Sequence, residues 1–412
     1  MSATGDRIAV VAEFGLWVTG AALIASAAGM RLPPVSLPPN LIPAPAPTHA
    51  PVDVIGLKVS PSPGSSATLE PSATAAPTIS PVVQGLAARL ASKDFQFKAA
   101  GTATESFVAE NSSVDIAATG SFSYKAGDEA ESTKMTSGGK TMSYDNVYGA
   151  NNAYVRKNGG PWVKKPRQAS DTAMWQIMLA PGRRFVDVGV ETKNGARLHR
   201  LVAADPVALS SEIDSLEPGV GASHVNLTFW TRDDGTPVVF RLEGTWDQTV
   251  AGLKAHVTAA HEFVISNLSG VTIAPPAGAW QWIVDSIGIG FGVPPGWART
   301  NVNSAVGWTT YGNATATIGY VTDEAGGRTF NQAVDFVEES LADPAQNRTE
   351  TTVGGEPAAR FGIHRSKQKD YVSETVVVHN GKIYQFVFFA AGKDSVADAL
   401  ASQILATLEF TS

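Results

Sequence analysis

The stretch FQFKAAGTATESFVAE, residues 95–110, decides the fold of most of this chain. Apolar and polar side chains alternate along it, and a period of two is typical of a β-strand with one buried and one exposed face. The alternation continues in SVDIAATGSFSYKAG from Ser113 and in later stretches, up to GLKAHVTAAHEFVIS from Gly252. Turn residues separate these stretches, so we predict an antiparallel meander between residues 82 and 274.

The composition limits the class of protein. A chain of 412 residues has room for two or three domains, and 43% hydrophobic residues are enough to build their cores. The formal net charge of −7 argues against a protein that coats nucleic acid, so we expect no nucleic-acid partner. Because the chain has no cysteine, it has no disulfide, thiolate metal site, thiol nucleophile or lipid-modified cysteine.

Residues 8–30, IAVVAEFGLWVTGAALIASAAGM, are apolar apart from three positions. About 20 apolar residues span a bilayer as a helix, so we predict a membrane anchor within residues 1–30. The alternatives are a cleaved signal peptide, which has a small-x-small site at Ala25-Ser26-Ala27, and a buried helix of a globular domain. With an anchor, the chain is a single-pass protein of the cell membrane whose bulk is extracytoplasmic; with a cleaved signal, it is secreted.

Residues 31–81 hold 13 of the 25 prolines. Such a composition cannot bury a core and favours extended polyproline II, at about 3.1 Å per residue. We therefore predict a disordered Pro-rich linker that holds the later domains away from the membrane.

Stretches with a helical pattern interrupt the predicted strands. They include VVQGLAARLASKDF from Val82 and DTAMWQIMLAPG from Asp171. Beyond residue 285 short strands surround a helix from Asn331, and the chain closes with a helix that carries Val396, Leu400, Ile404 and Leu408 on one stripe. Sheets with a few packed helices define an α+β fold. We expect an N-terminal transmembrane helix and the linker, then a sheet domain with helices at 82–274 and a small α+β sandwich domain at 285–412.

With these elements in place, residues 82–274 resemble the LolA/LppX-like group of exported bacterial lipid-binding proteins, to which RseB/MucB-type envelope-stress regulators are related. The resemblance depends on the strand order and on the hairpin NAYVRKNGGPWVKKP from Asn152, followed by an apolar helix. It implies a strongly curved antiparallel sheet with helices lining its hollow, where an acyl chain can sit. The lipobox cysteine of the LppX branch is missing here, and the apolar segment 8–30 would replace it as an anchor.

Residues 285–412 resemble the PsbP/DcrB type of small α+β domain. The features that carry this resemblance are IGIGFGVPPGW from Ile287, the helix in the middle of the segment and the terminal helix after YQFVFF. The family has accessory and binding roles, so the resemblance implies no catalytic residues.

Catalytic motifs do not emerge from the sequence. It contains no GxSxG elbow, no HExxH and no phosphate-binding GxxxxGK[ST]. His256 and His261 are five residues apart, which places them on opposite faces of a strand and argues against a metal pair. We predict that the chain is not an enzyme and uses no cofactor or metal ion.

Apolar side chains supply the candidates for lining a ligand site. Met174, Trp175 and Met178 lie on a short helix that is apolar nearly all round, and Trp230 lies on a later strand. Methionine fills irregular space and suits adaptable apolar sites. Such a helix can pack one face against the sheet and expose the other to a ligand. The alternative for all four residues is ordinary packing in the core.

The stretch YVRKNGGPWVKKPR, residues 154–167, gathers cations around a hairpin turn at Asn158-Gly159. The cations are Arg156, Lys157, Lys164, Lys165 and Arg167. They are candidates for contact with anionic lipid head groups, at about 1 kcal/mol per cation near such a surface. The alternative is that lysines on a strand edge prevent pairing with other edges.

Together these features predict a membrane-tethered extracytoplasmic protein whose middle domain binds an apolar ligand, a lipid being one class. Its partners would be the membrane, through the N-terminal helix, and that ligand. The alternative is an envelope protein-interaction or stress-sensing module that binds another envelope protein and takes no small-molecule ligand.

Overall fold

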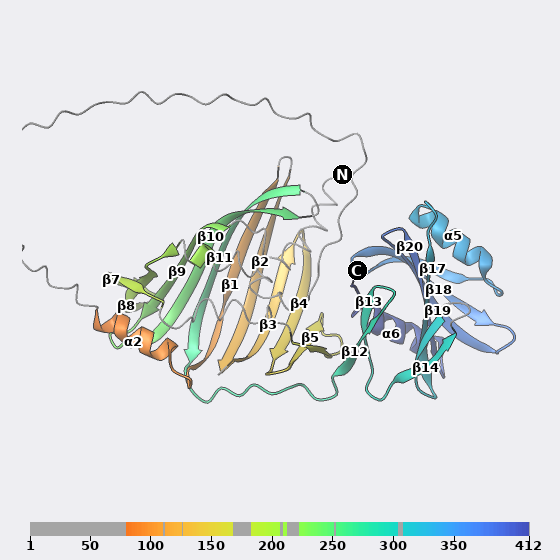
Figure 1. Ribbon diagram of the computed structural model, residues 1–412, viewed down its shortest axis with the longest axis horizontal. Helices are drawn as coiled ribbons and strands as arrows, with labels where there is room; N and C mark the ends of the chain where they lie inside the picture. The colour runs from red at the N-terminus through yellow and green to blue at the C-terminus, as the bar shows by residue number, and fades with distance from the viewer. Residues whose placement is uncertain are drawn as a thin grey trace, which may run out of the picture.

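The computed structural model describes residues 80–109, 112–125, 127–167, 183–206, 209–211, 222–250, 253–303 and 308–411. Figure 1 shows two units side by side: residues 80–267 form a broad sheet of long strands, and residues 280–411 form a smaller unit of strands and helices. The predicted anchor and all but the last residues of the predicted linker lie outside the described residues. None of the helices in the described ranges is both long and apolar enough to cross a bilayer.

The first unit begins with helix α2, Pro81–Leu90, whose buried side chains are Val82, Val83, Leu86 and Leu90. The strands that follow are β1 Gln96–Ala109, β2 Ser112–Lys125, β3 Asp128–Ser137, β4 Lys140–Tyr148, β5 Asn152–Lys157, β6 Val163–Pro166, β7 Phe185–Lys193, β8 Ala196–Ala203, β9 Ala222–Thr231, β10 Pro237–Val250 and β11 Leu253–Asn267. Consecutive strands pair antiparallel from β1 to β6 and from β7 to β11, and β1 also pairs with β11. The alternating sequence patterns predict this meander.

The two faces of this sheet differ because successive side chains of a strand point to opposite sides. We call the face that carries Phe97 of β1 the inner face and the opposite one the outer face. Helix α2 packs on the inner face, where its Leu86 shares an apolar cluster with Phe97 and with Phe240 of β10. The outer face is mostly exposed and rich in small residues such as Thr102 of β1 and Thr119 of β2.

The second unit contains a seven-stranded antiparallel sheet in the order β14-β15-β16-β20-β19-β18-β17. Its helices α5 and α6 lie on opposite faces of that sheet, since Val376 of β19 shares a cluster with α5 and Val377 shares one with α6. The bounds in this unit are β12 Trp280–Asp285, β13 Ile289–Val293, β14 Ala298–Asn303, β15 Trp308–Gly312, β16 Ala316–Glu324, α5 Phe330–Ser340, β17 Gln346–Val353, β18 Glu356–Arg365, β19 Asp370–His379, β20 Lys382–Ala390, α6 Asp394–Leu405 and β21 Glu409–Phe410.

The large sheet continues from the first unit into the second. Strand β12 pairs in parallel with β6, with Trp280 opposite Val163 and Gln281 opposite Lys164. Strand β13 pairs with β12, and the short β21 pairs with β13. The result is a mixed sheet of 14 strands in the order β21-β13-β12-β6-β5-β4-β3-β2-β1-β11-β10-β9-β8-β7.

The expected α+β fold class is therefore wrong. The described residues are mostly β-strand, with helices such as α2, α5 and α6 in the minority, and the large sheet is mixed where we expected an antiparallel sheet confined to one domain. The physical reason is the free edge of β6, whose backbone groups find partners on β12 of the second unit. The closing helix is also shorter than predicted: it ends at Leu405, and Val396 of the expected buried stripe is 47% exposed.

Candidate ligand-binding face

The inner face carries a second apolar cluster, farther along β1 than the cluster under α2. Its members come from the six strands β1 to β4, β10 and β11, and all are buried. They are Ala103, Phe107, Ile116, Ala118, Met135, Tyr144, Trp246, Val257 and Ala259. Small and large side chains thus share one apolar cluster, of the composition that lines sites for apolar ligands.

A buried acid and a buried histidine meet beside this cluster. Nε2 of His261 on β11 lies 3.1 Å from Oε1 of Glu105 on β1, and each side chain is 2% exposed. The strand register places His261 opposite Ala103, between Ala259 and Phe263 on the inner face. The other ring nitrogen of His261, Nδ1, is buried and has no hydrogen-bond partner among the described residues.

Three more buried polar atoms close to this cluster lack a hydrogen-bond partner in the described part of the chain. They are Thr133 Oγ1 on β3, Asn146 Oδ1 on β4 and Trp246 Nε1 on β10. The amide nitrogen of Asn146 does have a partner, because it donates to the Glu131 carboxylate. Native proteins leave few buried polar atoms unpaired. Other unpaired atoms of the described residues lie on the outer face and in the second unit, at Arg241, Ser373 and His379 for example. What marks the inner face is that these three atoms and His261 Nδ1 lie beside an apolar cluster.

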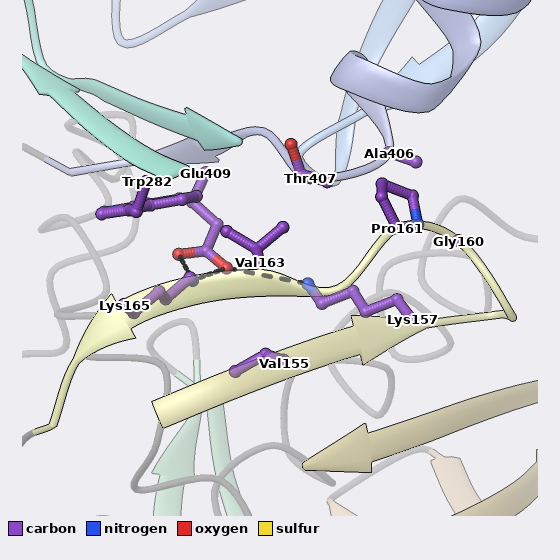
Figure 2. A pocket seen from close by; sticks show the side chains of 10 residues that line it. All are labelled: Val155, Lys157, Gly160, Pro161, Val163, Lys165, Trp282, Ala406, Thr407 and Glu409. Carbon is purple, nitrogen blue, oxygen red and sulfur yellow. Dashed lines mark hydrogen bonds and ion pairs between the residues drawn. The ribbon is translucent and has the colours of Figure 1, made fainter. Parts of the chain in front are cut away.

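The predicted basic hairpin lies elsewhere, at the seam between the two units (Figure 2). We define the seam by the contact of β5 and β6 with β12 and β21. Lys165 Nζ lies 2.7 Å from both carboxylate oxygens of Glu409 and 3.8 Å from the ring centre of Trp282. Lys157 Nζ lies 3.9 Å from Glu409 Oε1. Burial is the main cause that lowers the pKa of Lys157; the Glu409 carboxylate opposes this shift and the Lys165 charge adds to it.

A small cavity accompanies this ion pair. Its lining includes Val163, Trp282 and Thr407, and its volume is ≈ 20 Å³. That is room for about one water molecule. This cavity therefore has no space for an organic ligand. The ion pair of Lys165 with Glu409 and the pairing of β6 with β12 join the two units at the seam.

The remaining cations of the hairpin have mixed surroundings. Arg156 pairs with Asp145 at 2.9 Å and lies 4.7 Å from the ring centre of Trp162. Arg167 donates to the backbone carbonyls of Gly149 and Gly127. Lys164 is exposed on the outer face. Since β6 is paired with β12, these lysines do not guard a free strand edge, and contact with anionic lipid head groups stays a prediction for the cations that remain accessible.

Three of the predicted ligand-lining residues, Met174, Trp175 and Met178, lie outside the described residues. Trp230 is buried on the outer face, beneath the hairpin of β7 and β8. Its Nε1 donates to the Glu191 carboxylate, and Lys193 Nζ lies 4.5 Å from its ring centre. The structure therefore separates Trp230 from the inner face.

Sequence reasoning missed Glu105 and His261 as a pair. A signal was present, because Glu105 occupies the same alternating positions as Phe97 and Phe107, and His261 the same as Phe263. Their alternation already assigns both to the buried face. His256, by contrast, lies on the outer face, with its side chain 55% exposed and paired with Asp247. Within the described ranges, no group of His, Asp or Glu residues is arranged to hold a metal ion.

No family model matches the sequence, and no curated protein matches it. Among solved structures, the chain is similar to a PsbP protein (CyanoP) from Synechocystis sp. PCC 6803, with 16% identity, a TM-score of 0.26 and coverage of 35% of this chain and 98% of that one. It is similar to the LolA superfamily protein NE2245 from Nitrosomonas europaea, with 7% identity, a TM-score of 0.19 and coverage of 46% and 93%.

A third similar structure is the MucA/MucB complex of Pseudomonas aeruginosa, with 11% identity, a TM-score of 0.16 and coverage of 80% of this chain and 98% of that one. The similar structures thus include PsbP, LolA-superfamily and MucB proteins, the same groups that the sequence resembles.

Proposed function

We propose that this chain is an extracytoplasmic binding module whose first unit holds an apolar ligand, such as an acyl chain, on its inner face. The observation that carries the proposal is the coincidence, on one face, of the apolar cluster around Met135 and Trp246 with four buried polar atoms that lack described partners. An unpaired buried polar atom costs roughly 1–3 kcal/mol. A ligand with a long apolar part and a few polar atoms would cover the cluster and supply those partners.

The predicted N-terminal segments support the extracytoplasmic part of this proposal. The apolar residues 8–30 would hold the chain at the membrane, and the Pro-rich residues 31–81 would give the two units reach above it. In this arrangement the second unit adds rigidity, because the seam fixes it to the end of the sheet that carries the inner face.

Native mass spectrometry of the full chain, purified from the membranes of its own host in a mild detergent, tests the binding function. We expect an added mass that disappears after extraction with organic solvent. The matched variants are Ala118→Met and Ala117→Met, since these neighbouring alanines of β2 point to the inner and outer face. The first should lose the bound species and the second should keep it. Equal retention in both variants would place the ligand somewhere other than the inner face.

A second candidate function, a protein-interaction module, is favoured by strand β7. Strand β7 is the last strand of the large sheet, and the edge that faces away from β8 has no strand partner among the described residues. Val186, Val188 and Val190 are about half exposed, at 52%, 55% and 46%. A free edge with apolar side chains is the type of surface to which an extended peptide adds as a further strand.

A site-specific photocrosslinker at position 188 tests this second function in the native host. The control is a crosslinker at position 264, because Val264 is an exposed valine of a central strand. The interaction module predicts one discrete crosslinked protein from position 188 and none from 264, together with a first unit that carries no bound small molecule.

A further inference from the structure

Glu105 and His261 are in contact beside a buried apolar cluster, an environment that disfavours charged groups. Both side chains are 2% exposed, and the neighbours of His261 on its own strand and face are Ala259 and Phe263. A polar pair in such a place costs stability unless it is fully hydrogen-bonded. Here Nδ1 of His261 is buried without a described partner, so the pair is incomplete on the side of the imidazole.

The chemistry of the ring limits what can complete it. Nε2 faces Oε1 of Glu105 at 3.1 Å, and an ionised carboxylate can only accept, so Nε2 carries a proton in that contact. Nδ1 is then either a donor, when the imidazole is charged, or an acceptor, when it is neutral. A carboxyl group matches both states: a carboxylate oxygen accepts from Nδ1–H, and the hydroxyl of a carboxylic acid donates to a bare Nδ1. An ester carbonyl matches the first state alone, because it can only accept. An alcohol hydroxyl can serve both states, but it brings no negative charge to a charged imidazole.

We propose that His261, held in place by Glu105, binds the carboxyl head of a single-chain amphiphile whose apolar chain lies on the cluster around Met135 and Trp246. This inference rests on the proposed function and deepens it, because it names the class of ligand as a free fatty acid or a closely related carboxylic amphiphile. Glu105 acts as a positioning residue, and His261 is the residue that contacts the head group. The ligand should therefore be selected by its head and not by its chain alone.

Competition for a fluorescent fatty acid on the full chain tests the inference. The probe is anthroyloxy-labelled stearic acid, and the competitors are stearate, stearyl alcohol and methyl stearate. We expect stearate to displace the probe about tenfold more effectively than methyl stearate, the loss typical of one unmade hydrogen bond in a buried site. In His261→Gln, whose amide keeps the contact with Glu105 but not the group at Nδ1, this preference should fall below about threefold.

His256→Gln is the matched control, because it is the same substitution on the same strand at an exposed position of the outer face. It should leave the preference for stearate unchanged. Where His261→Gln fails to fold, Glu105→Gln takes its place, and the preference should drop several-fold because the ring loses its charged partner.

The outcomes separate the two claims. If no probe or competitor binds the wild-type chain, the proposed apolar-ligand function is overturned, and this inference with it. If the probe binds but wild type and His261→Gln show the same preference for stearate, the inner face binds a chain and the assignment of His261 is overturned. Equal displacement by stearate and stearyl alcohol in the wild type would show that the site does not select a carboxyl over a hydroxyl head, and would also overturn the assignment.

Discussion

The rings of Phe122 and Phe263 meet edge to face above strand β1, with 4.8 Å between their centres and 89° between their planes. They belong to β2 and β11, the two strands that flank β1, and in the register they lie opposite Ala99 and Gly101. Two large rings can meet across an intervening strand because its side chains are small. This contact closes the part of the inner face next to α2 and leaves the cluster around Ala103 beyond it.

We expect Gly101→Ala to destabilise the first unit by about 3 kcal/mol or more. A Cβ at this position would collide with the backbone carbonyl oxygen of Glu262 and would lie 2.6 Å from Cδ1 of Phe263. Gly149→Ala is the control, since its Cβ would lie 3.9 Å from its nearest neighbour, the backbone oxygen of Asn152, and the substitution should cost under about 1 kcal/mol. Thermal unfolding of both variants measures the difference, and similar melting temperatures would contradict the tight contact.

The ion pair of the seam should be expensive to break. Glu409→Gln leaves two buried or half-buried ammonium groups, Lys165 and Lys157, without their carboxylate. Removing one partner of a buried pair costs about 3–5 kcal/mol. Arg89→Gln is the control, because Arg89 and Asp234 form an exposed pair that should contribute under about 1 kcal/mol. Chemical denaturation compares them; a loss in Glu409→Gln no larger than that in the control would mean that the seam is not held by this charge pair.

Thr133→Val should make the ligand-free protein more stable. The Thr133 hydroxyl is buried without a described hydrogen-bond partner, so its replacement by a methyl group of similar shape removes a desolvation cost of roughly 1 kcal/mol. Thr119→Val, on the exposed outer face of the neighbouring strand, should change stability by less than about 0.5 kcal/mol. A clear destabilisation by Thr133→Val, measured by denaturant unfolding after delipidation, would indicate that a water or a retained ligand already bonds the hydroxyl.

Glu374 of β19 should make the stability of the second unit depend on pH. Its side chain is buried on the face of the sheet that packs against α5, and burial raises its pKa from 4.5 to about 7. The folded chain therefore keeps a proton that the unfolded chain releases between about pH 4.5 and 7. The contribution of Glu374 to the unfolding free energy falls as the pH rises through this window, by up to about 3 kcal/mol, and is constant outside it.

Glu374→Gln is expected to remove this dependence. The variant should melt at a higher temperature than the wild type at pH 8 and at nearly the same temperature at pH 4. Melting curves at both values measure the effect, and equal differences at the two pH values would show that folding does not raise the pKa of Glu374.

Local patterns predicted the strands and their turns well. Asn158-Gly159 and Asn380-Gly381 form hairpin turns in which both residues have positive φ, at 48° and 68° in the first and 47° and 75° in the second. This conformation is what an Asn-Gly pair favours between two strands. The alternation of apolar residues likewise separated His256 from His261, because the period of two is a property of neighbouring residues alone.

Contacts between distant segments could not be predicted in the same way. Lys165 and Glu409 are 244 residues apart, and β6 and β12 pair through two residues each, too few to leave a pattern in the sequence. The basic hairpin therefore suggested a surface patch, although Lys165 is buried against Glu409 and Trp282. The fold class was wrong for the same reason, since it depended on whether strands of the second unit extend the sheet of the first.

The pairing of β6 with β12 also determines how the chain would respond to cleavage. Residues 268–279 connect the units, while the backbone hydrogen bond from Trp280 N to Trp162 O and the ion pair of Lys165 with Glu409 join them without a covalent link. A protease that cuts this connector would produce two peptides that still elute as one particle. The same property makes the connector a natural place for new chain ends, so the protein should tolerate being expressed as two complementary fragments that assemble after synthesis.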